Sequence, residues 1–355
     1  MDVVKLSLLA LCFGLVGCGP APDMPVYKAA SVELLDTKDE KGFYLLPLKG
    51  EVSNGQKFWS GDYWALNQGN INIRWNAPVV DGWSYLSPTR EQVLLMLPEE
   101  IAQLSPTEKF DLYLGRYEFP LKEEVYTHAD RYALDWEGIC NGWAPSSMNH
   151  NEPTPKVVTN PEGVAISFGS SDIKALLSYY YAFHHKVENT QQLGRRCPRG
   201  NGWFNWNADC KNDLNAGSFH IVMANKVGKR NESFMVDIDR YKEVWNHPIL
   251  SYVSRVEGEA DAEPDSPAGT VKILDVRTKV TYVNESESNS WEPVRGTAHQ
   301  VVTVREYRYH LFIDVKNDII GGEWKSEDRP DFLWVMGPAP EFNGLLSGLR
   351  TLLND

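Results

Sequence analysis

The C-terminal third of the chain carries the strongest constraint on its fold. Residues 270–284, 300–315 and 318–326 are rich in β-branched and aromatic residues, and turn-forming segments separate them. Such segments are typical of β-strands joined by short connections. We therefore expect three antiparallel strands that pack on a sheet formed by earlier residues.

Helical patterns precede these strands. Residues 87–117 show apolar residues at helical spacing, and Ser87 and Ser105 each stand before a proline, as helix-capping residues do. A second amphipathic helix is predicted to start near Ser171, and a short terminal helix over residues 344–353. Helices followed by strands, in 355 residues of which 42% are hydrophobic, indicate an α+β protein with a large core.

The N-terminus indicates the compartment. The apolar stretch from Leu6 to Cys18 is too short to span a membrane and ends in small residues, as a secretory signal does. Its last four residues, Leu-Val-Gly-Cys, resemble the bacterial lipobox, in which cleavage precedes a lipidated cysteine. We expect an exported protein anchored through Cys18 to a bacterial membrane, the outer one in a Gram-negative host, facing the periplasm or cell surface. An ordinary cleaved signal peptide, with Cys18 incidental, is the alternative.

Five cysteines leave one thiol without an assigned partner. Cys12 lies in the signal segment, and Cys18 is the expected anchor. Cys197 and Cys210 flank a loop rich in Gly, Asn and Trp, and in an exported protein they are natural disulfide partners. Cys140 is then either a buried inert residue or a functional thiol.

The surroundings of Cys140 favour function. A loop followed by a helix that begins at or just before Cys140 is the simplest interpretation of this region. That arrangement places the sulfur near the helix N-terminus, where backbone N–H groups stabilise a thiolate.

His220 and Asp237 follow Cys140 in the order nucleophile, base and orienting group, which describes the papain and transglutaminase group. Alternating residues predict that His220 and Asp237 lie on neighbouring strands of a hairpin. A core role for His220 and a turn-capping role for Asp237 are the structural alternatives. Asn246 is a second candidate for the orienting group.

Longer motifs carry a resemblance to one family. Residues 244–248, VWNHP, resemble the VWNQP core of the transglutaminase elicitors of Phytophthora. The segments WSGDYW, SPTEKFDLYLG, GICNGWAPSS, SSDIKALL, AGSFHIVMANKVG, SFMVD and DIIGGEWKSEDRPDFLW are similar to that family and its bacterial relatives, in the same order. Together they cover roughly residues 58–336. His247 stands where the elicitor peptide has Gln, and Asn141 where many relatives have His.

The resemblance implies a papain-like core, with the Cys140 helix against an antiparallel sheet and additional C-terminal strands. It implies a protein-glutamine γ-glutamyltransferase with Cys140 as nucleophile, His220 as base and Asp237 as third member. A thioester with a protein glutamine would pass to a lysine or other amine. Trp136 or Trp143 would lie near the oxyanion site. We expect no cofactor and no metal.

Other functions share these residues. A papain-like cysteine peptidase, or a glutamine amidase or deamidase, uses the same triad, and a non-enzymatic surface lipoprotein needs none of it. The net charge of −13 argues against nucleic acid as a partner, because phosphate binding needs clustered Lys and Arg. We expect a signal peptide over 1–17, a tether and N-terminal segment over 18–57 and a transglutaminase elicitor-like catalytic domain over 58–355. Residues 26–57 are a candidate propeptide that masks the site.

Overall fold

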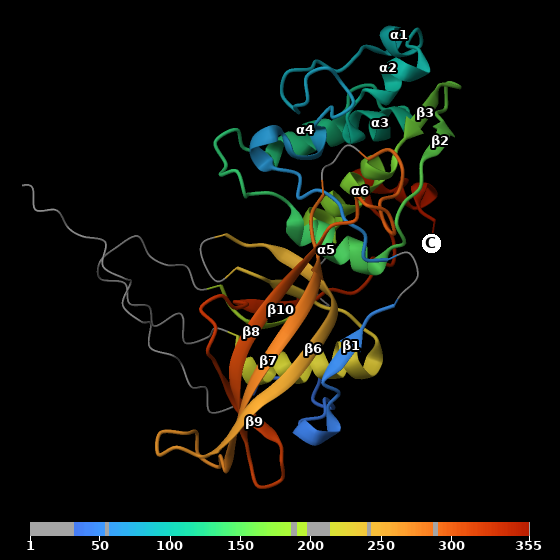
Figure 1. Cartoon of the computed structure of the whole chain (residues 1–355). Helices are drawn as coiled ribbons and strands as arrows, with labels where there is room; N and C mark the ends of the chain where they lie inside the picture. The colour runs from blue at the N-terminus through green and yellow to red at the C-terminus, as the bar shows by residue number, and fades with distance from the viewer. Residues whose placement is uncertain are drawn as a thin grey trace, which may run out of the picture.

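Two layers make up the molecule, a helical layer and a large antiparallel sheet (Figure 1). The structure is a computed structural model, and it describes residues 32–53, 57–185, 190–196, 214–239, 243–286 and 290–354. Helix α5 (Cys140–Asn149) lies where the two layers meet and packs on helix α6 and strand β6. Mixed helices and antiparallel strands confirm the predicted α+β class.

Short helices from the first half of the chain form the helical layer. They are α1 (Arg90–Val93), α2 (Pro98–Ala102), α3 (Pro106–Tyr113), α4 (Pro120–Thr127), α5 and α6 (Ser170–Tyr179), with the hairpin β2 (Lys156–Thr159) and β3 (Ala165–Phe168). The helix predicted near Ser171 is therefore confirmed. It continues into a π-helical turn, η4 (Tyr180–His184).

Of the two predicted helix caps, Ser105 is confirmed and Ser87 is wrong. Ser105 caps α3 in a reciprocal capping box with Glu108. Ser87 does not cap α1, because Thr89 receives the backbone N–H of Gln92 and starts the helix two residues later.

The sheet follows the order β4-β10-β5-β6-β7-β8-β9, and every paired strand is antiparallel to its neighbour. The strands are β4 (Gln191–Gly194), β5 (Met235–Asp237), β6 (Asn246–Asp261), β7 (Lys272–Val283), β8 (Val302–Ile313), β9 (Ile319–Trp324) and β10 (Phe332–Val335). The three strands expected after residue 270 are confirmed as β7, β8 and β9, but they extend the sheet by pairing with β6 instead of packing on a separate, earlier sheet. The predicted terminal helix is instead two 3-10 turns, η8 (Gly344–Leu346) and η9 (Leu349–Leu352).

The N-terminal segment belongs to the same sheet. Strand β1 (Lys49–Glu51) pairs antiparallel with β6, beside the stretch of β6 that pairs with β5. Phe43, in the 3-10 turn η1 (Phe43–Leu45), is buried and stacks on the ring of His220. The described residues of this segment therefore contribute to the core.

The predicted hairpin strand around His220 is wrong. Residues 216–223 form helix α7 (Ala216–Met223), which continues into the π-helical turn η7 (Ala224–Arg230) and appears yellow in Figure 1. Asn215 caps α7 by accepting the N–H groups of Gly217 and Ser218. Every residue of α7 is buried, the polar Ser218 and His220 included, so the alternation of polar and apolar residues marks no exposed strand face.

The contact between α5 and α6 leaves no space for a side chain at Gly142. A Cβ placed there would lie 2.0 Å from the carbonyl oxygen of Ser178 and 2.9 Å from Ala182. Glycine therefore lets the two helices approach closely, and this approach fixes the position of α5.

We expect Gly142→Ala to destabilise the protein by at least about 2 kcal/mol, because the added methyl group must push the helices apart. The melting temperature should fall by roughly 4 °C or more, measured by circular dichroism. Gly337→Ala is the matched control, since nothing lies within 4 Å of its added Cβ. Equal melting temperatures for the two variants would contradict this account of the packing.

Candidate active site

Cys140 is the first residue of α5, as the sequence predicted. Its side chain is buried, with 6% of the residue exposed, and its sulfur is a free thiol. The first N–H groups of a helix have no partner within the helix, so this position places donors beside the sulfur.

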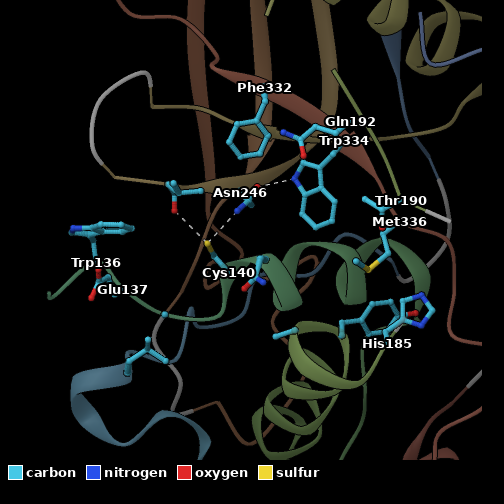
Figure 2. Close-up of a pocket in the computed structure, with 16 residues that line it drawn as sticks. Trp136, Glu137, Cys140, His185, Thr190, Gln192, Asn246, Phe332, Trp334 and Met336 are labelled. Carbon is cyan, nitrogen blue, oxygen red and sulfur yellow. Dashed lines mark hydrogen bonds between the residues drawn. The ribbon is translucent and has the colours of Figure 1, made fainter. Parts of the chain in front are cut away.

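Two groups from the segment that enters β6, Val244 and Asn246, contact the sulfur (Figure 2). The side-chain amide of Asn246 donates to the Cys140 Sγ at 3.6 Å, and the thiol donates to the carbonyl oxygen of Val244 at 3.5 Å. Trp334 Nε1 donates to Asn246 Oδ1 at 2.7 Å. Because that bond occupies the amide oxygen, it fixes the Asn246 side chain with its NH2 group toward the sulfur.

Cys140 opens onto a cleft with a volume of about 680 Å³ (Figure 2). Aromatic and apolar side chains dominate its walls. The lining residues are Leu66, Trp136, Glu137, Gly138, Cys140, Asn141, Tyr181, Ala182, His185, Thr190, Gln192, Val244, Asn246, Phe332, Trp334 and Met336. A cleft of this size can hold one extended side chain of a protein substrate.

The predicted tryptophans have different positions. Trp136 lines the cleft, at the side where Glu137 also lies (Figure 2). Trp143, a residue of α5, is fully buried and packs edge-on against His247 of β6, with ring centroids 5.9 Å apart. It therefore packs α5 against β6 and does not line the cleft.

Asp237 was predicted to bond the ring of His220, but its hydrogen bonds are to backbone N–H groups. It ends β5 and is paired in register with Asn246 of β6. Its Oδ1 accepts the backbone N–H groups of Trp245 and Asp239. Burial raises the Asp237 pKa to about 8, the neighbouring Asp331 adds to this, and the two backbone N–H groups lower it.

Burial also controls the thiol. It raises the pKa of Cys140 to about 12, and the charges of Glu285 and Asp237 add to this, while the Asn246 N–H groups lower it. The thiol is therefore protonated at neutral pH in the empty site. Substrate binding or proton transfer must assist its ionisation.

The structure does not bring His220 to Cys140. His220 is fully buried on α7, where its Nδ1 shares a hydrogen bond of 2.7 Å with the hydroxyl of Tyr309. Helix α7 packs on β8 and β9, whereas α5 packs on β6 and α6. Burial alone lowers the His220 pKa to about 4. This placement supports the core role for His220, and the predicted hydrogen-bonded triad does not form.

All eight histidines of the sequence lie within the described residues. In that part of the chain, neither hydrogen bond of the Cys140 sulfur involves one of them. His185 lines the cleft, but its Nε2 donates to the carbonyl of Gly337. His247 is the next residue after Asn246 on β6 and is buried.

Several predicted features lie outside the described residues, namely the Cys18 anchor and the Cys197–Cys210 disulfide. No helix in the described ranges is long and apolar enough to span a bilayer. The same ranges hold no cluster of three or more His, Cys, Asp or Glu side chains suited to a metal ion.

Comparison with known proteins identifies the family. The sequence profile of the transglutaminase elicitor family matches residues 127–349, well over half of the chain. The chain belongs to the transglutaminase elicitor family. This match spans α5, every lining residue of the cleft except Leu66, and both Asp237 and Asn246.

A solved structure shares the fold. The GP42 transglutaminase from Phytophthora sojae superimposes with a TM-score of 0.67 over 89% of this chain and 93% of that one, at 22% sequence identity. A search of curated proteins gave no match. The structural likeness confirms the expected fold, and the family match confirms the resemblance found in the sequence.

Three further site residues had no assigned role in the sequence interpretation. Val244 and Trp334 contact Cys140 and Asn246, and Glu285 has the largest charge effect on the thiol. The motifs around residues 244–248 and 331–334 pointed to the first two. Glu285 follows β7 in a polar run of Glu, Ser and Asn that carries no recognisable local signal.

Asp237→Asn tests the pKa of the buried carboxyl group. The folded protein keeps Asp237 protonated up to a pH of about 8, while the unfolded chain ionises near 4, so unfolding releases a proton between these values. The carboxyl group thus lowers stability as pH rises from 4 to 8. We expect the variant's free energy of unfolding, relative to the unchanged protein, to rise over this range by roughly 5 kcal/mol, measured by urea denaturation. A difference that stays constant with pH would contradict the raised pKa.

Proposed function

We propose that this protein is a protein-glutamine γ-glutamyltransferase in which Cys140 attacks the glutamine side chain and forms a thioester. One observation carries the proposal. The free thiol begins a buried helix at an apolar cleft, in a chain that belongs to the transglutaminase elicitor family.

The site supplies donors for the oxyanion. The first turn of α5 offers N–H groups, and the fixed NH2 group of Asn246 points at the sulfur from the opposite side. A glutamine carbonyl carbon bonded to Sγ would place its oxygen among these groups. Preorganised donors at that point stabilise the tetrahedral intermediate. We therefore assign Asn246 to the oxyanion site instead of the orienting role considered from the sequence.

The reaction has two halves. Sγ bonds to the carboxamide carbon, Cδ, of a protein glutamine, the C–N bond breaks, and the nitrogen leaves as ammonia with the proton lost by the thiol. A lysine or another amine then attacks the thioester carbon, the C–S bond breaks, the amine's proton returns to the sulfur and an isopeptide bond remains. The apolar walls formed by Trp136, Phe332, Trp334 and Met336 limit the water that would otherwise hydrolyse the thioester.

Hydrolysis is the competing reaction at the same thiol, as in a cysteine peptidase or glutamine deamidase. Incubation with a glutamine-containing protein and a dansyl amine separates these reactions. Fluorescent protein indicates transfer, new peptide fragments indicate proteolysis, and ammonia release without label indicates deamidation. We also propose that a lipid attached to Cys18 anchors the enzyme to a membrane outside the cytoplasm. Exposed proteins would there supply the glutamine and lysine side chains.

We expect Cys140→Ala to abolish dansyl-amine incorporation, because it removes the only thiol among the described residues, the one at the cleft. His220→Gln should keep activity within about threefold in its folded fraction, since His220 contacts the core and not the cleft. Its main effect should be a lower melting temperature from the loss of the Tyr309 hydrogen bond. Complete inactivity of a well-folded His220→Gln variant would restore His220 as the base and contradict this site.

We expect Asn246→Ala to lower kcat about 100-fold or more, because one oxyanion donor is lost. Trp334→Phe removes only the Nε1 donor that fixes the amide, so it should lower kcat by a smaller factor with little change in KM. Steady-state amine incorporation measures both. If Asn246→Ala retained full kcat, the oxyanion assignment would be wrong.

A further inference from the structure

The cleft has two ends, with Cys140 between them (Figure 2). Trp136 and Glu137 lie at one end, and Thr190 and Met336 lie at the other. Transfer brings two substrates to one sulfur in turn. The amine must therefore reach the thioester from a side that the bound glutamine protein leaves open, and the two ends can serve one substrate each.

The formal charge of the cleft wall lies at one of these ends. The lining residues include a single carboxylate, that of Glu137, and neither lysine nor arginine. In the described part of the chain, no cation pairs with this carboxylate, and its one hydrogen bond is the Leu134 N–H group, which Oε2 accepts at 3.0 Å. A positively charged group of a substrate would find an available partner there.

The segment that carries Glu137 is fixed to earlier residues of the chain. The Leu66 N–H group donates to the Glu137 carbonyl at 2.9 Å, and the Ile139 N–H group donates to the Tyr63 carbonyl at 2.6 Å. Gly138 allows this contact, because a Cβ placed there would lie 2.4 Å from the Tyr63 carbonyl oxygen. The backbone at the carboxylate is thus in place before a substrate arrives, which lowers the entropic cost of binding.

Trp136 gives the same end an aromatic wall. Its indole lines the cleft and already attracts one cation, because the Arg196 guanidinium lies 5.6 Å from the ring centroid. Arg196 is not itself a lining residue. Indole faces attract cations, and apolar surfaces bury the methylene groups of a lysine side chain. A lysine combines both features.

Resting on the function proposed above, we propose that the Trp136–Glu137 end of the cleft is the subsite for the amine substrate and selects cationic primary amines such as lysine. Glu137 attracts the ammonium group, and Trp136 packs against the methylene groups. The glutamine protein occupies the other end. There the Thr190 hydroxyl is buried with no hydrogen-bond partner among the described residues, so a peptide group of the substrate can bond to it.

Glu137 acts in capture of the amine and not in thioester formation. The captured ammonium group releases one proton to solvent before its nitrogen attacks the thioester carbon. A second proton of the amine returns to the sulfur as the C–S bond breaks. In such a two-step reaction, kcat/KM for the glutamine substrate reports thioester formation, whereas kcat/KM for the amine reports capture and attack.

Glu137→Gln tests the subsite with two amines. Dansyl cadaverine carries an ammonium group, whereas a dansyl alkoxyamine of the same chain length is neutral at neutral pH. We expect kcat/KM for dansyl cadaverine to fall about fivefold. The values for the alkoxyamine and for the glutamine protein should stay within about twofold, because neither brings a cation to this end. Equal losses for both amines, or a loss confined to the glutamine protein, would overturn the proposal.

Salt gives a second measurement on the same proteins. Added NaCl should lower kcat/KM for dansyl cadaverine in the unchanged protein, because salt screens the attraction between the ammonium group and Glu137. Glu137→Gln should remove this dependence. The same salt dependence in both proteins would overturn the role of Glu137.

Asp135→Asn is the matched control. Asp135 is an exposed carboxylate of the same segment, does not line the cleft, and accepts the Asn67 side-chain amide at 2.9 Å. The same loss of charge there should change no value by more than about twofold. A loss equal to that of Glu137→Gln would assign the effect to net charge and overturn the proposal.

Thr190→Val tests the opposite end. We expect kcat/KM for the glutamine protein to fall about fivefold, with the ratio between the two amines unchanged. A changed amine ratio in Thr190→Val would mean that the ends are assigned the wrong way round. Failure of the unchanged protein to release ammonia or to incorporate either amine would instead contradict the proposed function itself.

Discussion

The close approach of α5 to α6 at Gly142 determines the geometry of the whole site. It sets the depth of α5 above the sheet, and the first residue of that helix therefore meets the first residue of β6. Asn246 can then donate to the sulfur of Cys140, and Trp334 of β10 can donate to the amide oxygen of Asn246. Because these contacts come from segments far apart in the sequence, the site exists only when both layers are assembled.

The protonation states of the acidic groups at the site follow from their burial, because no cation is among the causes that shift the pKa values of Cys140 and Asp237. Cys140 and Asp237 are buried and Glu285 is partly buried, and this burial raises the pKa of each group. Such a site is neutral and unreactive when empty. A bound substrate that displaces water or supplies a hydrogen-bond donor would change that balance.

Local patterns in the sequence predicted the elements that combine a regular period with clear ends. The strands after residue 270 alternate in composition, the Ser105 cap precedes Pro106, and the helix at Cys140 follows a loop. The segment of helix α7 alternates polar and apolar residues like a strand, because its polar Ser218 and His220 are buried together with the apolar residues. The position of His220 was misjudged for the same reason. Cys140 and Asn246 could be found from family motifs, whereas Glu285 and His247 meet only through tertiary packing, which no short stretch of sequence records.

The pairing of β1 with β6 has a consequence for the limits of the folded unit. Without residues 32–53, part of one side of β6 would present unpaired N–H and C=O groups, and the Phe43 face of His220 would meet water. Open strand edges of this kind recruit other chains and promote aggregation. A shortened chain that keeps every residue of the cleft would therefore be a poorer soluble protein, even though its chemistry is intact.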